Sequence, residues 1–342
     1  MRTLSLPVLA LICAIAVAHA GAQTPPDSEA TFTIRTDLVL TDVFVTYRKY
    51  SQRVSPLTAE DLLVREDGAP QQIRYFTHDT LPLSVIFLFD LTQTVHPVLK
   101  SLAAGAQTVL AHLRPQDEAA VMVFYSTTRM LQPFTHDHAL LAQAIDDASK
   151  MTIPEGTFLN EDVFQATEAI GQATVPDRRR VLLFLTDGTS NIPSSLAQKT
   201  IGKSAPAYLH TEAEATDALL HSGASVSALI ERSALSDFVI AAGLVGGSPL
   251  VNSLTHPGDV RGFAAESGGI VLDSGRENVA AQMGDMLDAL RSRYTIGYVP
   301  SVSQPTGKFC RIQIALAPHF FLTRPEFKRR GLVVHTRVGY YR

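Results

Sequence analysis

Residues 83–94 read LSVIFLFDLTQT, and the change from apolar to oxygen-bearing side chains within this stretch decides the fold prediction. The apolar run from Leu83 to Phe89 is typical of a parallel strand that helices cover on both faces. Asp90, Thr92 and Thr94 follow it with one carboxylate and two hydroxyls. We therefore predict a buried strand whose carboxyl end carries polar side chains at the solvent boundary.

Similar apolar runs return farther along the chain, at residues 119–125, 181–185 and 226–230, with a weaker one at 269–272. Stretches typical of helices lie between or after them, at residues 97–113, 138–149, 160–173, 207–222, 260–267 and 278–291. Strands and helices that alternate in this way predict an α/β fold, a Rossmann-like doubly wound sheet that is mostly parallel. Residues 130–134 are expected to add an antiparallel edge strand.

The two ends of the mature chain look β-rich instead. Residues 31–46 alternate in polarity, residues 57–62 predict a short helix with a Thr58–Asp61 capping box, and residues 63–66 and 72–76 predict a hairpin. Further strands are expected within residues 294–299, 308–317 and 332–338. We predict that segments 31–80 and 294–342 form one small β domain, into which an α/β domain at residues 81–293 is inserted.

The N-terminus has the features of a secretory signal. One positive charge at Arg2 precedes an apolar run over residues 4–18 and the small-x-small triplet Ala18-His19-Ala20. We predict a signal peptide at residues 1–20 and a flexible leader at 21–30, so that the protein is exported to the periplasm or the extracellular space. The apolar run is shorter than the roughly 20 residues that a spanning helix needs, so no transmembrane segment is expected after signal removal, although a retained anchor is the alternative.

Charge and cysteine content narrow the class of partner. The chain carries 29 basic and 33 acidic residues, a formal charge of −4, so no strong positive field predicts nucleic acid as a partner. Only two cysteines are present, and Cys13 leaves with the signal peptide. Cys310 therefore has no internal disulfide partner, and we expect it to pack within a strand.

Three separate loops are predicted to bring oxygen atoms together. Asp187-Gly188 follows the apolar strand at residues 182–185, and Thr157 ends a loop before a helix. In open α/β sheets the binding crevice lies at the carboxyl ends of the strands. We therefore predict a divalent-metal site, for Mg²⁺ with Mn²⁺ or Ca²⁺ as alternatives, formed by oxygen ligands from five residues: Asp90, Thr92, Thr94, Thr157 and Asp187.

Simpler interpretations exist for each motif taken alone. Asp90 and Thr92 could cap the following helix, and Asp187-Gly188 could be a plain turn. Asp137, between two histidines, is interpreted as a helix cap rather than as a metal ligand. The triplet Arg178-Arg179-Arg180 is interpreted as a solvated group of charges before a buried strand rather than as an anion site.

The combined motif resembles that of a known family. Asp-x-Thr-x-Thr at residues 90–94, the distant Thr157 and the distant Asp187-Gly188 resemble the metal-ion-dependent adhesion site of von Willebrand factor type A domains, with threonine at the two positions where that site has serine. Residues 57–71, LTAEDLLVREDGAPQ, resemble a segment of the secreted bacterial VWFA-related family best known from acidobacteria. Residues 263–269, 290–298, 307–309 and 338–340 are similar to that family as well.

The resemblance implies a binding function. Two carboxylates and neutral hydroxyls leave a divalent ion incompletely neutralised, so an acidic group of a protein or cell-envelope ligand can complete its shell. We expect an adhesion-type module rather than an enzyme, because no general base, histidine or thiol stands beside Asp90 or Asp187 in these motifs. A metal-dependent hydrolase with the same five residues is the alternative from another class. A metal-free scaffold is a third, because the added methyl groups of Thr92 and Thr94 crowd the site.

Overall fold

The structure is a computed structural model of the chain. It describes residues 38–47, 54, 56–78, 81–125, 127–151, 157–173, 178–188, 210–231, 259–274, 277–302, 304–327 and 331–342. The predicted signal peptide and leader lie outside the described residues, as does most of the segment 190–214. All statements below concern the described part of the chain.

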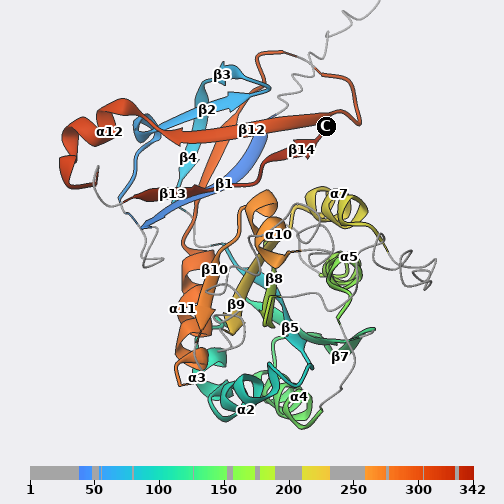
Figure 1. Cartoon of the computed structure of the whole chain (residues 1–342). Helices are drawn as coiled ribbons and strands as arrows, with labels where there is room; N and C mark the ends of the chain where they lie inside the picture. Colours follow the sequence, from blue (N-terminus) through green and yellow to red (C-terminus); the bar gives the residue numbers. More distant parts are fainter. Residues whose placement is uncertain are drawn as a thin grey trace, which may run out of the picture. The chain divides into compact units, whose positions relative to one another are not determined.

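A six-stranded sheet forms the centre of the α/β region (Figure 1). Its strands are β5 (Leu83–Asp90), β6 (Glu118–Phe124), β7 (Thr128–Thr135), β8 (Arg179–Thr186), β9 (Ser225–Glu231) and β10 (Val271–Ser274). The order is β10-β9-β8-β5-β6-β7, with β7 antiparallel to β6 and all other neighbours parallel. The predicted mostly parallel sheet with an antiparallel edge strand is confirmed.

Helices cover both faces of this sheet. One face packs against α2 (His96–Ala104), α3 (Ala106–Leu110), α4 (His138–Lys150) and α11 (Val279–Arg291). The other face packs against α5 (Leu159–Ile170), α7 (Glu212–Ser222) and α10 (Val260–Ser267). Because every residue of β5 is buried between these layers, its apolar run has the environment that the sequence predicted.

The predicted helix at residues 97–113 is in fact two helices, α2 and α3, that meet at Gly105. A β-carbon at Gly105 would lie 2.5 Å from the β-carbon of Ala280 on α11, which is closer than real β-carbons approach. The close approach of α11 therefore requires glycine at this point. The apolar periodicity of the sequence runs through the break and does not reveal it.

The chain ends form two four-stranded antiparallel sheets. The first has the order β13-β1-β11-β4 and the second β14-β12-β2-β3. Their strands are β1 (Val39–Tyr47), β2 (Leu62–Glu66), β3 (Ala69–Gln71), β4 (Ile73–Thr77), β11 (Tyr294–Tyr298), β12 (Phe309–Leu316), β13 (Leu332–His335) and β14 (Gly339–Tyr341). Each sheet therefore pairs strands from both ends of the chain, β1 with β11 and β2 with β12.

The two antiparallel sheets share one apolar core, to which Val43 and Ile296 of the first sheet and Val64 and Ile312 of the second contribute. A buried carboxylate also joins them. Glu66 on β2 accepts hydrogen bonds from the hydroxyl of Tyr298 on β11, at 2.7 Å, and from that of Tyr340, at 3.1 Å. Cys310, on β12, is a free, buried thiol, as the sequence predicts.

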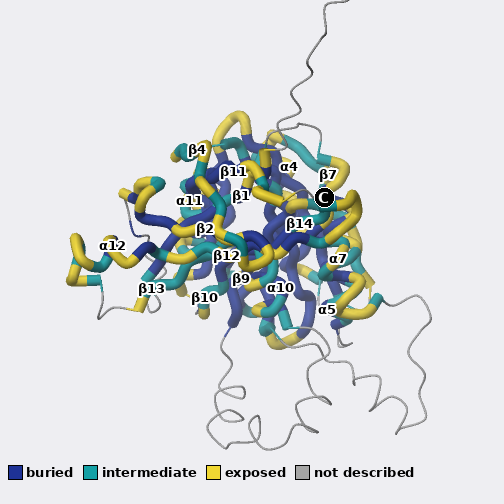
Figure 2. The backbone as a smooth tube through the Cα atoms, turned by 90° about the horizontal axis from the view of Figure 1, so that it is seen from above, coloured by how far each residue is buried: buried dark blue, intermediate teal, exposed yellow. Residues whose placement is uncertain are grey.

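Several local predictions need correction or addition. The Thr58–Asp61 capping box is present, on a short 3-10 helix at Ala59–Asp61. The predicted hairpin is wrong in its second strand, because β2 turns through Asp67-Gly68 into β3, whereas β4 pairs with β11 in the other sheet. The helix α12 (Pro318–Thr323) was not predicted, and Figure 2 shows it mostly exposed. No helix among the described residues combines the length and apolar character needed to cross a membrane.

The interpretation of Arg178-Arg179-Arg180 as solvated charges is wrong for Arg179, whose side chain is buried. Its guanidinium donates to the Asp42 carboxylate of β1 at 2.9 Å and to the carbonyl oxygen of Arg291 at 2.7 Å. It also donates to the Thr295 hydroxyl of β11 at 3.2 Å. Arg179 thereby links the first residue of β8 to the antiparallel sheet.

A second buried arginine fixes α11 against the start of the sheet. The Arg291 guanidinium lies 2.6 Å from a carboxylate oxygen of Asp117, and both side chains are almost fully buried. The same carboxylate accepts from the backbone N–H groups of Leu83 and Arg114, each at 2.8 Å. Removing one partner of a buried pair leaves an uncompensated charge.

We therefore expect Arg291→Met to lower the free energy of unfolding by about 3 kcal/mol, measured by urea denaturation. The control is Arg261→Met, which breaks the half-exposed pair between Arg261 and Asp273 at 2.9 Å. That variant should lose less than about 1 kcal/mol, because exposed ion pairs contribute little. Equal losses in both variants would contradict the role given to Arg291.

His335 on β13 is held as a neutral ring. Its Nδ1 lies 3.0 Å from the carbonyl oxygen of Gly269, its Nε2 lies 2.8 Å from the Thr46 hydroxyl, and its ring stacks on Phe44. Since a carbonyl can only accept, Nδ1 carries the proton and Nε2 accepts from the hydroxyl. Burial, with a smaller contribution from the positive charge of Arg293, lowers the pKa of His335 from 6.5 to about 4.

The unfolded chain therefore binds a proton to His335 more readily than the folded protein does. Stability from this residue is present above pH 6.5 and is lost as the pH falls towards 4. The free energy of unfolding should fall when the pH is lowered from 7 to 5. In His335→Gln this fall should be smaller than in wild type by up to about 2 kcal/mol, measured by urea denaturation at both pH values. The exposed His319 gives the control His319→Gln, and a reduction of the same size there would refute the assignment.

Candidate functional site

The carboxyl edge of the six-stranded sheet holds the predicted site. β5 lies at the centre, with β6 on one side and β8 on the other, so the chain reverses its direction across the sheet at this strand. Such a topological switch point is where open α/β sheets form a binding crevice. The register pairs Phe89 with Leu185, so Asp90 and Asp187 leave adjacent strands at the same level.

Asp90 is fully buried and fixed by two hydrogen bonds. One carboxylate oxygen accepts from the backbone N–H of Thr92 at 2.9 Å, and the other accepts from the hydroxyl of Thr186 at 2.9 Å. The first of these bonds orders the loop that follows β5. Asp90 therefore positions Thr92 as well as contributing its own charge.

Thr92, Thr94 and Asp187 continue this arrangement. The hydroxyl oxygens of Thr92 and Thr94 lie 3.1 Å apart, and the Thr94 hydroxyl donates to the Asp187 carboxylate at 2.7 Å. Gly188 follows with a φ of 78°, which supports the predicted tight turn. One hydrogen-bonded network across two loops thus joins Asp90, Thr92, Thr94 and Asp187.

The fifth predicted ligand, Thr157, lies shortly before the start of α5 in the chain. Thr157 is buried two residues before α5 begins, and the carbonyl oxygen of the next residue, Phe158, accepts from the Asp162 N–H at 2.9 Å. Asp162 in turn lies close enough to Asp90 for the negative charge of Asp90 to act on it. Asp162 in the first turn of α5 is thus near Asp90, and Thr157 precedes that turn in the chain, while its role as a fifth ligand stays a prediction.

Electrostatics at the cluster favour a positive ligand. The pKa of Asp90 is raised from 3.8 to about 7, first by burial and then by the negative charge of Asp187, against the lowering effect of its hydrogen bonds from Thr92 and Thr186. Two neighbouring carboxylates, of which Asp90 is fully buried, repel each other unless a proton or a cation compensates them. The donor set of carboxylates and hydroxyls suits a hard divalent cation. Among the described residues, no group of three or more His, Cys, Asp or Glu side chains could hold a metal ion, so a cation at this cluster would depend on hydroxyl oxygens as well as on carboxylates.

The sequence reasoning missed Asp162. It is fully buried on α5, accepts from the Thr128 hydroxyl at 2.6 Å, and leaves its second carboxylate oxygen without a hydrogen-bond partner among the described residues. Burial chiefly, and the charges of Asp90 and Glu161, raise the pKa of Asp162 well above 3.8. In the sequence, Asp162 lies beside Val163 and one turn before Ala166, on the apolar face of the predicted helix. A carboxylate on an apolar helix face is the sequence signal that could have indicated a buried acidic residue.

The hydrogen bond from Thr128 supports the buried Asp162 carboxyl. We expect Thr128→Val to lower the free energy of unfolding by about 1–3 kcal/mol, because the carboxyl then loses its donor in an apolar setting. Urea denaturation measures this loss. The exposed neighbour provides the control Thr127→Val, which should change stability by less than about 0.5 kcal/mol. A Thr128→Val variant as stable as this control would contradict the role of the hydrogen bond.

No protein-family model and no curated protein matches the sequence. Solved structures do match. A von Willebrand factor type A protein from Catenulispora acidiphila shares 12% identity over 77% of this chain and 71% of its own, with a TM-score of 0.43. The conserved hypothetical protein BatB from Bacteroides thetaiotaomicron shares 16% identity over 61% of this chain and 98% of its own, with a TM-score of 0.39.

The von Willebrand factor domain of the type V pili tip protein Mfa5 from Porphyromonas gingivalis is a further match. It shares 12% identity over 61% of this chain and 95% of its own, with a TM-score of 0.40. Since these identities and scores are low, the fold description depends on the strand order and register of the chain itself.

Proposed function

We propose that this von Willebrand factor type A-like chain is an exported binding module, which recognises an acidic group of a protein or cell-envelope ligand through a divalent cation. The hydrogen-bonded network from Asp90 through Thr92 and Thr94 to Asp187 carries the proposal. It stands at the switch point of the sheet, and its member Thr94 is exposed. The secreted bacterial VWFA-related family is the proposed subfamily, on the motifs of the sequence.

The residues fit such an ion. Asp90, Thr92, Thr94 and Asp187 would hold it, with Thr157 as the fifth ligand from the start of α5. A bound ion supplies a positive centre with exchangeable positions, at which a carboxylate of the partner can bind. Asp90 would stay ionised beside the cation, since the cation offsets both its burial and its repulsion from Asp187.

The threonines in place of serines are compatible with this arrangement. Thr92 is buried and Thr94 is exposed, yet their hydroxyl oxygens lie within 3.1 Å of each other. The added methyl groups therefore leave the two hydroxyl oxygens next to each other and allow Thr94 to donate to Asp187. This geometry supports metal binding over the metal-free scaffold, while a metal-dependent hydrolase at the same residues remains the rival that turnover would reveal.

Metal binding should stabilise the purified chain. We expect Mg²⁺ or Mn²⁺ at about 100 times the dissociation constant to add about 2.7 kcal/mol to the free energy of unfolding, visible as a higher thermal midpoint. Asp187→Asn should lose most of this gain, because the cation loses one of two carboxylates. The control is Asp285→Asn, which makes the same charge change at an exposed position of α11.

Two outcomes would reject parts of the proposal. A thermal midpoint that neither ion raises, together with no heat of binding in calorimetry, would refute the metal site. The hydrolase would be favoured instead if the metal-loaded wild-type protein turned over ester, phosphate or peptide substrates and Asp187→Asn did not. Retention of an envelope component on the immobilised chain, lost on adding a chelator and in Asp187→Asn, is the expected result for a binding module.

A further inference from the structure

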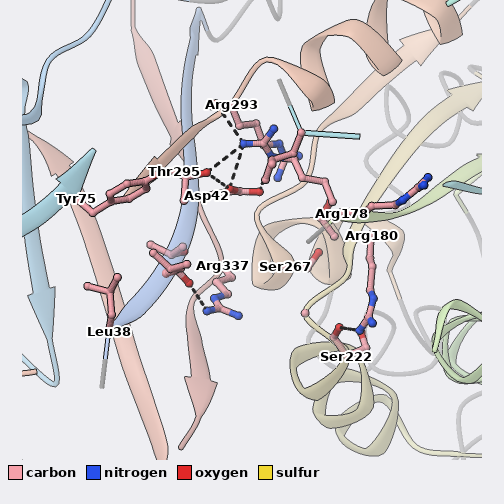
Figure 3. A pocket seen from close by; sticks show the side chains of 16 residues that line it. Leu38, Asp42, Tyr75, Arg178, Arg180, Ser222, Ser267, Arg293, Thr295 and Arg337 are labelled. Atoms are coloured by element: carbon pink, nitrogen blue, oxygen red, sulfur yellow. Dashed lines mark hydrogen bonds and ion pairs between the residues drawn. The ribbon is translucent and has the colours of Figure 1, made fainter. Parts of the chain in front are cut away.

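A second site lies at the opposite, amino edge of the six-stranded sheet. A cavity of about 530 Å³ is lined there by the first residues of β8, by the end of α7, and by residues of β1 and β11. Figure 3 shows Arg178 and Arg180 on one side of this cavity and Asp42, Thr295 and Arg337 on the other. Its volume is within the range of small-molecule binding pockets.

The lining is strongly positive. Of the sixteen lining residues, five are arginine (Arg178, Arg179, Arg180, Arg293 and Arg337) and one, Asp42, is acidic, which gives a formal charge of +4. The whole chain has a formal charge of −4. Positive charge is therefore concentrated in this cavity against the balance of the protein, as expected for a site that attracts anions.

The single carboxylate is already engaged. Asp42 accepts from Arg179 Nε at 2.9 Å and from the Thr295 hydroxyl at 3.2 Å. Two other arginines are oriented by backbone carbonyls, Arg180 by Ser222 at 2.9 Å and Arg337 by Leu40 at 2.7 Å. These two guanidinium groups donate to neutral acceptors, so their hydrogen bonds do not neutralise their charges, and Asp42 is the one acidic residue of the lining.

Arg293 gives the strongest indication of a ligand. It is only 4% exposed, and its Nε and Nη2 atoms have no hydrogen-bond partner among the described residues. Its guanidinium lies 4.7 Å from the centre of the Phe44 ring. Burial chiefly, and the nearby charge of Arg179, lower the pKa of Arg293 to about 10, so that it is still charged at neutral pH.

A buried charge with unused donors is unfavourable unless an opposite charge accepts from it. The Nε atoms of Arg178 and Arg337 are also buried without a hydrogen-bond partner among the described residues. Guanidinium groups match the paired oxygens of phosphates and carboxylates. An oxyanion next to Arg293 would therefore offer an acceptor and an opposite charge to a guanidinium that the described chain leaves with two unused donors.

One wall of the cavity is apolar. Leu38, Leu40 and Tyr75 are 40–46% exposed and line the cavity beside the arginines. Their side chains meet above Gly297 of β11, where a β-carbon would lie 2.8 Å from the β-carbon of Tyr75. Exposed apolar side chains next to positively charged groups are typical of sites for organic anions rather than for simple ions.

We propose that this cavity binds a small organic anion bearing a phosphate or carboxylate group. Arg293 binds its oxyanion, the other arginines of the lining add positive charge, and Leu38, Leu40 and Tyr75 contact its apolar part. The site is independent of the proposed metal site, since the two lie at opposite edges of the sheet. Phosphate and carboxylate share the same guanidinium chemistry, so the probes below separate them.

Calorimetry on the purified chain in metal-free buffer tests the proposal with four probes: phenyl phosphate, benzoate, inorganic phosphate and the neutral benzyl alcohol. We expect saturable binding of phenyl phosphate or benzoate, at least tenfold weaker binding of inorganic phosphate, and none of benzyl alcohol. The stronger of the two aromatic anions identifies the preferred oxyanion. Saturable binding of none of the anions would overturn the proposal.

Arg293→Met separates a ligand-binding role from a structural one. If Arg293 serves the ligand, the ligand-free variant should unfold at the same or a higher temperature than wild type, because an unpaired buried charge is removed. The dissociation constant of the bound anion should rise at least tenfold. A lower thermal midpoint with unchanged anion binding would show that Arg293 is structural and would overturn the proposal.

Two further variants complete the test. Arg178→Gln changes a half-buried arginine of the cavity, and it should weaken anion binding at least threefold even if Arg293→Met fails to fold. Arg129→Gln makes the same change at an exposed position of β7, outside the cavity, and should bind the anion as wild type does. Equal weakening in both variants would indicate a general charge effect and would overturn the assignment to this cavity.

Discussion

The burial of β5 on both faces is the constraint on which the rest of the structure depends. A strand without a solvated face needs helices on both sides, and its parallel neighbours β6 and β8 then align their carboxyl ends at one edge. Polar side chains can appear only where the covering layers end. Asp90 is therefore desolvated at the boundary of the core, and its repulsion from Asp187 is a direct consequence of how the strand is packed.

The amino edge of the same sheet carries positive rather than negative side chains where the covering layers end. Arginines occupy the positions where β8 begins, and the buried Arg179 joins this edge to β1 and β11 through Asp42 and Thr295. The long arginine side chain reaches from one sheet to the other, and its planar guanidinium group can donate to several acceptors at once. The two edges of one sheet thus present acidic oxygens at one end and guanidinium groups at the other.

The antiparallel sheets contribute side chains to one of these two edges. They supply Asp42, Arg337 and the apolar wall of the arginine-lined cavity, and they pair the first described strand, β1, with β11 and β13 from the other end of the chain. Among the described residues, by contrast, the cluster at the carboxyl edge comes from the α/β region, from the residues directly after β5 and β8. A ligand at either edge would contact different parts of the protein.

The sequence by itself determined the elements that depend on local pattern. Apolar runs predicted the strands of the central sheet, periodicity predicted its helices, and strand-end residues predicted the cluster of Asp90, Thr92, Thr94 and Asp187. Only tertiary structure decided which partner each β segment takes, as when β4 leaves the predicted hairpin to pair with β11. It also decided the burial of Arg179 and Asp162, because the charge of a side chain says nothing about which distant segment will cover it. Local patterns record solvent exposure within one element, whereas these contacts arise between segments far apart in the chain.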